Sequence, residues 1–210
     1  MPSRRAPAFT LIELMVTVAI ISVLALIALK SFSVLRKRAY AAEVSGMLGE
    51  FALKEEAYRT VNGSYLSTGT SENDIRPQLT AGSEPVKKDI AIATDSNLST
   101  WKQLNIRPPS SQLWCGYVVM AFASGATVSS VGTGEGANQV TASYPSLGGT
   151  GTLPEPWFYG RACCDLGGTA TTSATCETSS GSVKDCTGKT QSTFTITATN
   201  NVVGSGCEDE

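Results

Sequence analysis

The N-terminal part of the chain carries two successive hydrophobic patterns. Residues 9–29 are predominantly apolar on all sides of a helix, Glu13 is the single charged residue among them, and Lys30 ends the run. About 20 apolar residues in a helix span the hydrocarbon core of a bilayer. The first pattern therefore predicts that residues 9–30 lie in a membrane or among other apolar helices.

The second pattern is one-sided and covers residues 31–61. Apolar side chains recur at the spacing of one helix face, and they are Tyr40, Val44, Met47, Leu48, Phe51 and Tyr58. Charged residues occupy the other faces, namely Glu43, Glu50, Lys54, Glu55, Glu56 and Arg59. No proline interrupts residues 8–76, and the turn-forming sequence NGSY follows at residues 62–65. We therefore expect one helix from about Phe9 to about Thr60, whose second half packs on a globular domain.

Residues 62–210 predict a globular head. Three segments have the residue types and alternation of strands, and they are residues 113–125, 157–166 and 192–200. A short helix is expected near residues 96–104. The small-residue segments 125–153 and 167–191 predict loops, and the acidic end that begins at Cys207 predicts a solvated tail. One long helix followed by three strands favours an α+β fold with a small antiparallel sheet.

Composition excludes several classes of function. The chain has 210 residues, a formal net charge of −2 and no histidine. It therefore lacks the commonest general base and metal ligand, and it has no overall basic field for nucleic acid. No G-x-S-x-G sequence and no recognisable pair of catalytic carboxylates is present. The absence of these catalytic features predicts a non-enzymatic protein, and nothing in the sequence indicates a cofactor. Asp165 is a candidate calcium ligand, but a single aspartate does not define a site, so no metal is assigned.

Six cysteines beyond the apolar segment indicate disulfide bonds in an exported head. They are Cys115, Cys163, Cys164, Cys176, Cys186 and Cys207. A zinc site is disfavoured, because no C-x-x-C and no histidine occur and adjacent cysteines cannot easily ligate one ion. Reduced, buried thiols are the alternative to disulfide bonds. Adjacent cysteines rarely bond to each other, so we expect distant partners, but the pairing stays open.

Glu13 is the residue that most needs an explanation. A carboxylate in a membrane-spanning helix costs about 2.5–3.5 kcal/mol at the bilayer centre and less near one end. Residues 1–8 form a short basic leader with Arg4 and Arg5, and no signal-peptidase site follows the apolar segment. The segment is therefore expected to stay in the mature protein. Glu13 then either snorkels to the headgroup level or has a counter-ion.

This N-terminal end resembles a known signal. The sequence AFTLIELMVTVAI, residues 8–20, follows a short basic leader and precedes a long helix and a cysteine-bearing head. It closely resembles the class III signal of type IV pilins and type II secretion pseudopilins, over residues 4–29. The resemblance implies a type IV pilin fold, cleavage between Ala8 and Phe9 by a membrane prepilin peptidase, and N-methylation of Phe9. It also implies an inner-membrane assembly platform and stacking of subunits into a helical filament.

The resemblance implies a role for Glu13 in setting the register of that assembly. In a staggered filament its carboxylate approaches the Phe9 ammonium of a neighbouring subunit, and a wrong stagger leaves both charges unpaired at low dielectric. Three residues depart from the family pattern, because Ala8 and Ser22 replace common glycines and Lys30 replaces a common proline. Without a helix breaker this helix should resist melting, which slightly favours a minor subunit over a major one.

The resemblance thus implies a structural subunit of a type IV pilus that serves adhesion or motility. A pseudopilin of a type II secretion system is the alternative. A DNA-uptake filament subunit is the remote alternative, with Lys87, Lys88, Lys102 and Trp101 as contacts, but a solvated charged face is the simpler interpretation and we expect no nucleic acid partner. Before assembly, the chain would cross the inner membrane once with its head in the periplasm. After assembly it would be extracellular.

Overall fold

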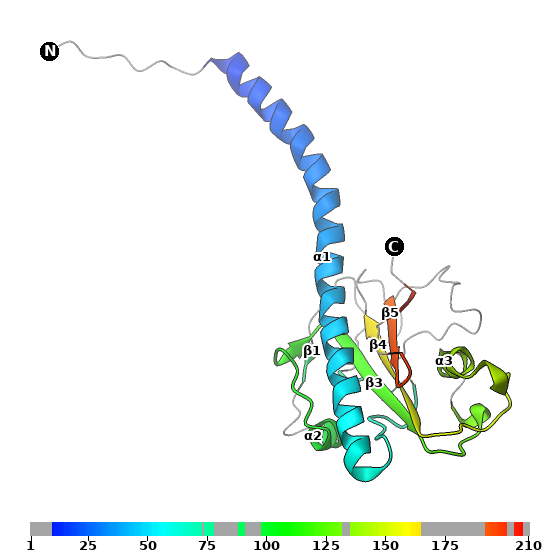
Figure 1. Ribbon diagram of the computed structural model, residues 1–210. Helices are drawn as coiled ribbons and strands as arrows, with labels where there is room; N and C mark the ends of the chain where they lie inside the picture. Colours follow the sequence, from blue (N-terminus) through cyan, green and yellow to red (C-terminus); the bar gives the residue numbers. More distant parts are fainter. Residues whose placement is uncertain are drawn as a thin grey trace. The chain divides into compact units, whose positions relative to one another are not determined.

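The computed structural model describes residues 10–72, 74–77, 88–90, 98–131, 135–164, 192–200 and 204–207. The chain divides into two compact units, residues 1–39 and residues 40–210. Helix α1, Leu11–Asn62, contributes residues to both units (Figure 1). The prediction of one uninterrupted helix from about Phe9 to about Thr60 is confirmed, and the ends differ from it by two residues.

In the first unit, the large apolar side chains of α1 that the structure describes are exposed. Their exposed fractions lie between 52% and 77% from Leu11 to Leu26. Apolar surface of this extent is stabilised when lipid or another apolar surface removes it from water. Among the residues that the structure describes, no helical stretch is both long enough and apolar enough to cross a membrane.

α1 ends at the turn that the sequence predicts. Gly63 has a φ of 74°, a left-handed conformation that a residue without a Cβ adopts readily. Its N–H donates to the carbonyl oxygen of Arg59 at 2.7 Å. The side-chain amide of Asn62 donates to the carbonyl oxygen of Tyr58 at 3.0 Å. Two of the last carbonyls of the helix are satisfied in this way, so the helix ends without leaving them unpaired.

The head contains a four-stranded antiparallel sheet in the order β3-β4-β5-β6. The strands are β3, Cys115–Phe122, β4, Trp157–Cys164, β5, Ser192–Thr197, and β6, Gly204–Cys207. The three predicted strands are confirmed with shorter bounds, and so is the α+β fold. β6 is a correction, because its sequence GSGC has no apolar alternation and the strand exists through main-chain pairing with β5. Residues 208–210 of the predicted tail lie outside the described residues.

Two smaller elements extend the core that α1 begins. β1, Lys88–Asp89, pairs with β2, Gln112–Leu113, in a two-stranded antiparallel sheet. Helix α2, Ser99–Gln103, confirms the short helix expected near residues 96–104. Trp101 of α2 is fully buried and meets the ring of Phe51 edge-on, with ring centroids 4.9 Å apart. The aromatic contact fixes α2 against α1.

Residues 125–153 are not the long loop that their composition predicts. They contain a 3-10 helix, Val128–Ser130, then helix α3, Glu135–Ser143, and a second 3-10 helix, Pro145–Leu147. Apolar residues of this segment pack with two aromatic residues of β4 into a second core, which consists of Val128, Val131, Val140, Leu153, Trp157 and Tyr159. The loop prediction is wrong because widely spaced aliphatic residues show no local period, and only packing on the sheet brings them together.

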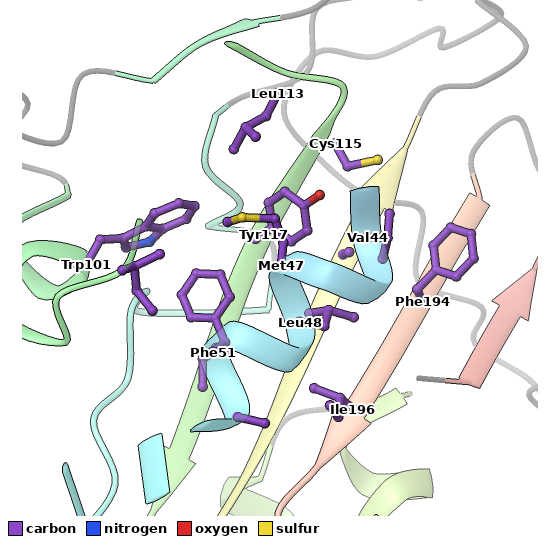
Figure 2. Close-up of a cluster of buried hydrophobic side chains, with 14 of the residues drawn as sticks. Val44, Met47, Leu48, Phe51, Trp101, Leu113, Cys115, Tyr117, Phe194 and Ile196 are labelled. Atoms are coloured by element: carbon purple, nitrogen blue, oxygen red, sulfur yellow. The ribbon is translucent and has the colours of Figure 1, made fainter. Parts of the chain in front are cut away.

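Both faces of the main sheet are therefore covered. On one face, Val44, Met47, Leu48 and Phe51 of α1 pack with Tyr117 of β3 and with Phe194 and Ile196 of β5 (Figure 2). The predicted apolar face of α1 is confirmed at these positions. On β4, the alternate residues Trp157 and Tyr159 belong to the second core, because successive side chains of a strand point to opposite faces.

Candidate functional site

The N-terminal end of α1 is closed by a reciprocal pair of residues, Thr10 and Glu13. The backbone N–H of Glu13 donates to Thr10 Oγ1 at 3.3 Å, and the backbone N–H of Thr10 donates to Glu13 Oε2 at 3.5 Å. The Thr10 hydroxyl also donates to Glu13 Oε2 at 3.3 Å. This arrangement is a capping box, which satisfies backbone N–H groups that have no partner within the helix.

The capping box holds the Glu13 carboxylate within the first turn of α1. A carboxylate there is stabilised by the positive end of the helix dipole. It lies beside the backbone nitrogen of Thr10, the residue that follows Phe9. Sequence reasoning missed Thr10, although the T-x-x-E spacing of residues 10–13 is a signature of helix starts. Ala8 and Phe9, which define the predicted cleavage point, lie outside the described residues.

The surroundings of Glu13 are apolar. Leu11, Ile12 and Leu14 have exposed fractions of 77%, 71% and 58%, and Glu13 is the single charged residue between Thr10 and Leu29. When such a surface leaves water, a carboxylate on it is costly unless it is paired. A partner that covers this part of α1 must therefore supply a cation or further hydrogen-bond donors.

Three glutamates in the second half of α1 accept hydrogen bonds from backbone N–H groups of the head. The pairs are Glu43 with Trp114 at 2.9 Å, Glu50 with Arg107 at 2.5 Å and Glu55 with Leu66 at 2.9 Å. The amphipathic pattern places these glutamates away from the core face. That placement is wrong for Glu55, which is fully buried. These carboxylates hold the head to the helix.

A polar network closes the C-terminal end of α1. The Arg59 guanidinium donates to the Tyr65 hydroxyl at 2.8 Å, and this hydroxyl donates to Glu56 Oε1 at 2.7 Å. Arg59 also forms a 3.4 Å ion pair with Glu155, to which the Tyr144 hydroxyl donates at 3.0 Å. Burial raises the pKa of Tyr65 to about 12, and the hydrogen bond to Glu56 adds to the rise. Tyr65 therefore stays protonated near neutral pH, and the network ties α1 to the connection between β3 and β4.

Cys115 and Cys164 form a disulfide bond between β3 and β4. The two residues are opposite each other in the strand register, and their Cα atoms lie 4.4 Å apart, as in a non-hydrogen-bonded antiparallel pair. Cys163 is also disulfide-bonded. Cys176 and Cys186 lie outside the described residues, as does the side chain of Cys207. The Cys115–Cys164 disulfide is one of the possible cysteine pairings among which the sequence alone did not choose.

A buried ion pair lies between β4 and the segment that follows α1. Arg161 Nη1 is 3.8 Å from Glu72 Oε2, and Arg161 is fully buried. Gly136 of α3 packs so closely here that a Cβ would lie 2.8 Å from Glu72 Oε1 and 2.8 Å from the Tyr159 ring. Removal of one member of a buried pair leaves an uncompensated charge, which is strongly destabilising. The pair therefore has a structural role in the head.

The residues considered as nucleic-acid or metal contacts are only partly described. Trp101 has an exposed fraction of 0%, so its ring cannot stack on a base. Lys102 is exposed, whereas Lys87, Asp165 and the side chain of Lys88 lie outside what the structure describes. Within the described ranges, no group of three or more histidine, cysteine or acidic residues is placed to hold a metal ion. The candidate site is thus the Thr10–Glu13 end of α1.

A comparison with protein families matches residues 3–29 to the prokaryotic N-terminal methylation motif. The matched residues include Arg4 and Arg5 of the basic leader, Ala8, Phe9 and Glu13. Comparisons with curated proteins and with solved structures give no significant match. The similarity thus concerns the end of the chain at which Thr10 and Glu13 form the capping box.

Proposed function

Because residues 3–29 carry the class III signal of type IV pilin-like proteins, we propose that this chain is a structural subunit, major or minor, of a type IV pilus. The motif is the observation that carries the proposal, since it marks chains that prepilin peptidase processes and that assemble with other pilin-like subunits. The exposed apolar surface of residues 11–26 supports an assembly role. Adhesion or motility is the proposed use of the filament.

Processing creates the assembling form of the chain in this proposal. Prepilin peptidase hydrolyses the peptide bond between Ala8 and Phe9, so that Phe9 gains a free amine, which is then methylated. The new ammonium stands one residue before Thr10. In the subunit before assembly, the capping box gives the Glu13 carboxylate hydrogen-bond donors from its own chain.

Assembly then supplies the counter-ion for Glu13. The carboxylate pairs with the Phe9 ammonium of a neighbouring subunit, whose apolar helix packs alongside. Both charges lie at low dielectric, where an unpaired ion is destabilising by several kcal/mol. The main effect of the pair is therefore to select the correct axial stagger, and its contribution to the net stability of the filament is smaller than this effect on register. Neighbouring subunits of this or a related chain are the proposed partners.

The proposed route runs from the inner membrane to the cell exterior. Residues 9–30 anchor the subunit in the inner membrane with the head in the periplasm, and an assembly platform inserts it into the filament. Disulfide bonding of the head agrees with an oxidising compartment on that side.

Mass spectrometry of the chain from its native membrane or filaments tests the processing step. We expect Phe9 as the first residue, with the mass of one added methyl group. A mature chain that retains residues 1–8 contradicts the proposal, because no amine is then available to pair with Glu13.

Immunogold labelling of sheared filaments tests the role of the subunit. Signal along the whole shaft is expected for a major subunit, and sparse or tip-only signal for a minor one. A correctly processed chain with no signal outside the cell envelope favours the alternative, a pseudopilin of a type II secretion system.

A further inference from the structure

The outer edge of β3 is covered by the segment that follows α1. β3 is an edge strand of the main sheet, and an uncovered edge is a template for pairing with other chains. We call residues 66–77 the edge segment. At one end, Arg76 and Tyr117 form an antiparallel bridge with N–H to O distances of 2.9 and 2.8 Å. The edge segment therefore takes the place of a fifth strand beside that part of β3.

Farther along β3, the edge segment uses hydroxyl groups as well as main-chain groups. Thr68 Oγ1 accepts a hydrogen bond from the Val119 N–H at 2.7 Å, and the Thr68 N–H donates to the Val119 carbonyl at 2.8 Å. Ser67 Oγ accepts from the Ala121 N–H at 2.9 Å and donates to the Ala121 carbonyl at 3.3 Å. The N–H groups of Val119 and Ala121, which point away from β4, are thus hydrogen-bonded only while residues 67 and 68 stay beside β3.

Glu55 of α1 holds the start of the edge segment. Its Oε2 accepts a hydrogen bond from the Leu66 N–H at 2.9 Å, immediately before Ser67. The side chain is fully buried, and among the described residues its Oε1 has no hydrogen-bond partner. Gly63, with its positive φ, lies between α1 and the edge segment. Gly63 can act as a hinge, because glycine changes its backbone conformation at little steric cost.

The environment of Glu55 disfavours its ionised form. Burial raises the pKa of Glu55 from 4.5 to about 7, the Leu66 N–H opposes the rise, and the like charge of Glu56 adds to it. The nearby cation, Arg59, is bonded to the Tyr65 hydroxyl and paired with a different carboxylate.

Among the described residues, the other elements packed on this side of α1 bring no charge that stabilises the anion. The sheet residues on the α1 face include Tyr117, Val119, Phe158, Gly160 and Ala162. Of these only Tyr117 titrates, and burial raises its pKa above the ordinary value. α2 contributes the Thr100 hydroxyl, which donates to the Thr68 carbonyl at 3.4 Å, while Lys102 of the same helix is exposed.

We propose that the Glu55 carboxyl is an acid-strengthened latch that keeps the edge segment on β3. In its protonated form, Glu55 holds Leu66, and with it Ser67 and Thr68, against the strand. When the proton leaves to solvent, the buried anion has one hydrogen bond and a like charge beside it. Release of residues 66–68, with Gly63 as the hinge and Glu72 still paired with Arg161, then exposes the anion to water and uncovers the N–H groups of Val119 and Ala121.

The direction of the pH effect follows from linkage. The closed form binds the proton more tightly than the open form, in which Glu55 returns toward its ordinary pKa of 4.5. The closed form is therefore favoured most below pH 4.5. The opening constant increases as the pH rises from 4.5 toward about 7, and above about 7 it no longer changes. Between these limits the opening constant rises about tenfold per pH unit.

Amide hydrogen exchange on the intact chain in detergent micelles, read at single residues, tests the latch. After correction for the intrinsic pH dependence of exchange, the protection factors of Val119 and Ala121 should fall more than about tenfold from about pH 5 to about pH 7. Glu55→Gln, which keeps the shape but cannot ionise, should abolish the fall. The matched control Glu56→Gln removes only the smallest contribution to the raised Glu55 pKa, so it should retain most of the fall.

Amides of the central strand β4 report opening of the whole head. Because unfolding of the whole head also releases the Glu55 proton, β4 protection depends on pH as well. Lower protection of Val119 and Ala121 than of β4 at each pH supports the latch, whereas equal protection means that these amides exchange only through unfolding of the whole head and overturns it. The latch is also overturned if the protection factors of Val119 and Ala121 in the wild type do not change with pH. It is overturned as well if they fall in Glu55→Gln as much as in the wild type. If Glu55→Gln does not fold, Glu55→Met is measured instead, and the comparison of Val119 with β4 in the wild type decides in either case. The inference does not depend on the proposed function.

Discussion

Glu43 Oε1 on α1 lies 2.9 Å from the backbone nitrogen of Trp114, the residue immediately before β3. The same oxygen accepts a hydrogen bond from the buried Tyr117 hydroxyl at 3.3 Å. One carboxylate thus joins the helix to the start of the main sheet, through two donors that are distant from it in sequence. The second half of α1 is therefore held to the head by polar contacts as well as by its apolar face.

Glu43→Ala should lower the free energy of unfolding by about 1.5–3 kcal/mol, because a charged acceptor is lost and two donors are left without it. Urea denaturation of the intact chain in detergent measures the change. Lys102→Ala, at an exposed position of α2, is the control and should change stability by less than about 0.5 kcal/mol. Equal effects of the two substitutions would show that the Glu43 contacts contribute nothing specific.

Loss of the Cys115–Cys164 disulfide should destabilise the head. The two residues are separated by 49 positions. In the chain-entropy model, a cross-link of this span raises the free energy of the unfolded chain by about 4 kcal/mol, because it lowers the conformational entropy of that chain. We expect Cys115→Ala with Cys164→Ala to lower the free energy of unfolding by about 2–4 kcal/mol. Addition of a reductant should lower the melting temperature of the wild type more than that of the double variant. An identical response of both proteins would argue against this contribution.

Glu55 should make the head more stable in mild acid than at neutral pH. Its pKa in the folded chain is raised from 4.5 to about 7, so the stabilisation is fully present below the lower value and is lost as pH rises through the higher one. The shift corresponds to about 3 kcal/mol. The difference in unfolding free energy between wild type and Glu55→Gln, measured from about pH 4 to pH 8, should follow this curve. A constant difference would contradict it.

Glu13→Ala should leave membrane insertion intact and reduce filament assembly, because neighbouring Phe9 ammonium groups lose their counter-ion. The measurement is the yield of sheared filaments relative to the amount of processed chain in the membrane. Thr17→Val is a matched control on the same helix, since Thr17 makes a local hydrogen bond to the Leu14 carbonyl at 2.9 Å. Wild-type filament yield in Glu13→Ala would remove the proposed register role.

Thr10→Val should weaken the first turn of α1, because the valine keeps the shape of threonine but lacks the capping hydroxyl. Loss of an N-cap costs about 0.5–2 kcal/mol, and the Glu13 carboxylate then loses a donor that holds it in place. Filament yield should fall, and Thr10→Ser, which restores the hydroxyl, should recover it. Failure of Thr10→Ser to recover the yield would point to a requirement other than the capping box.

The long helix, the strands near residues 115–122, 157–164 and 192–197, and the N-terminal signal were determined by the sequence itself. Each is local: a helical period, a run of β-branched and aromatic residues, or a fixed spacing of Ala8, Phe9 and Glu13. Thr10 also belongs to this group, since its capping-box spacing is readable from the chain.

Only the tertiary structure decided the rest. Glu55 has the local pattern of a solvent-facing residue, yet the edge segment buries it, because burial depends on what the distant chain places over a position. α3 and β6 arise in small-residue segments without a period, through packing on β4 and main-chain pairing with β5. The partner of Cys164 was likewise set by strand register, which brings Cys115 opposite it. These features rest on contacts between residues far apart in the chain, and local periodicity carries no information about such contacts.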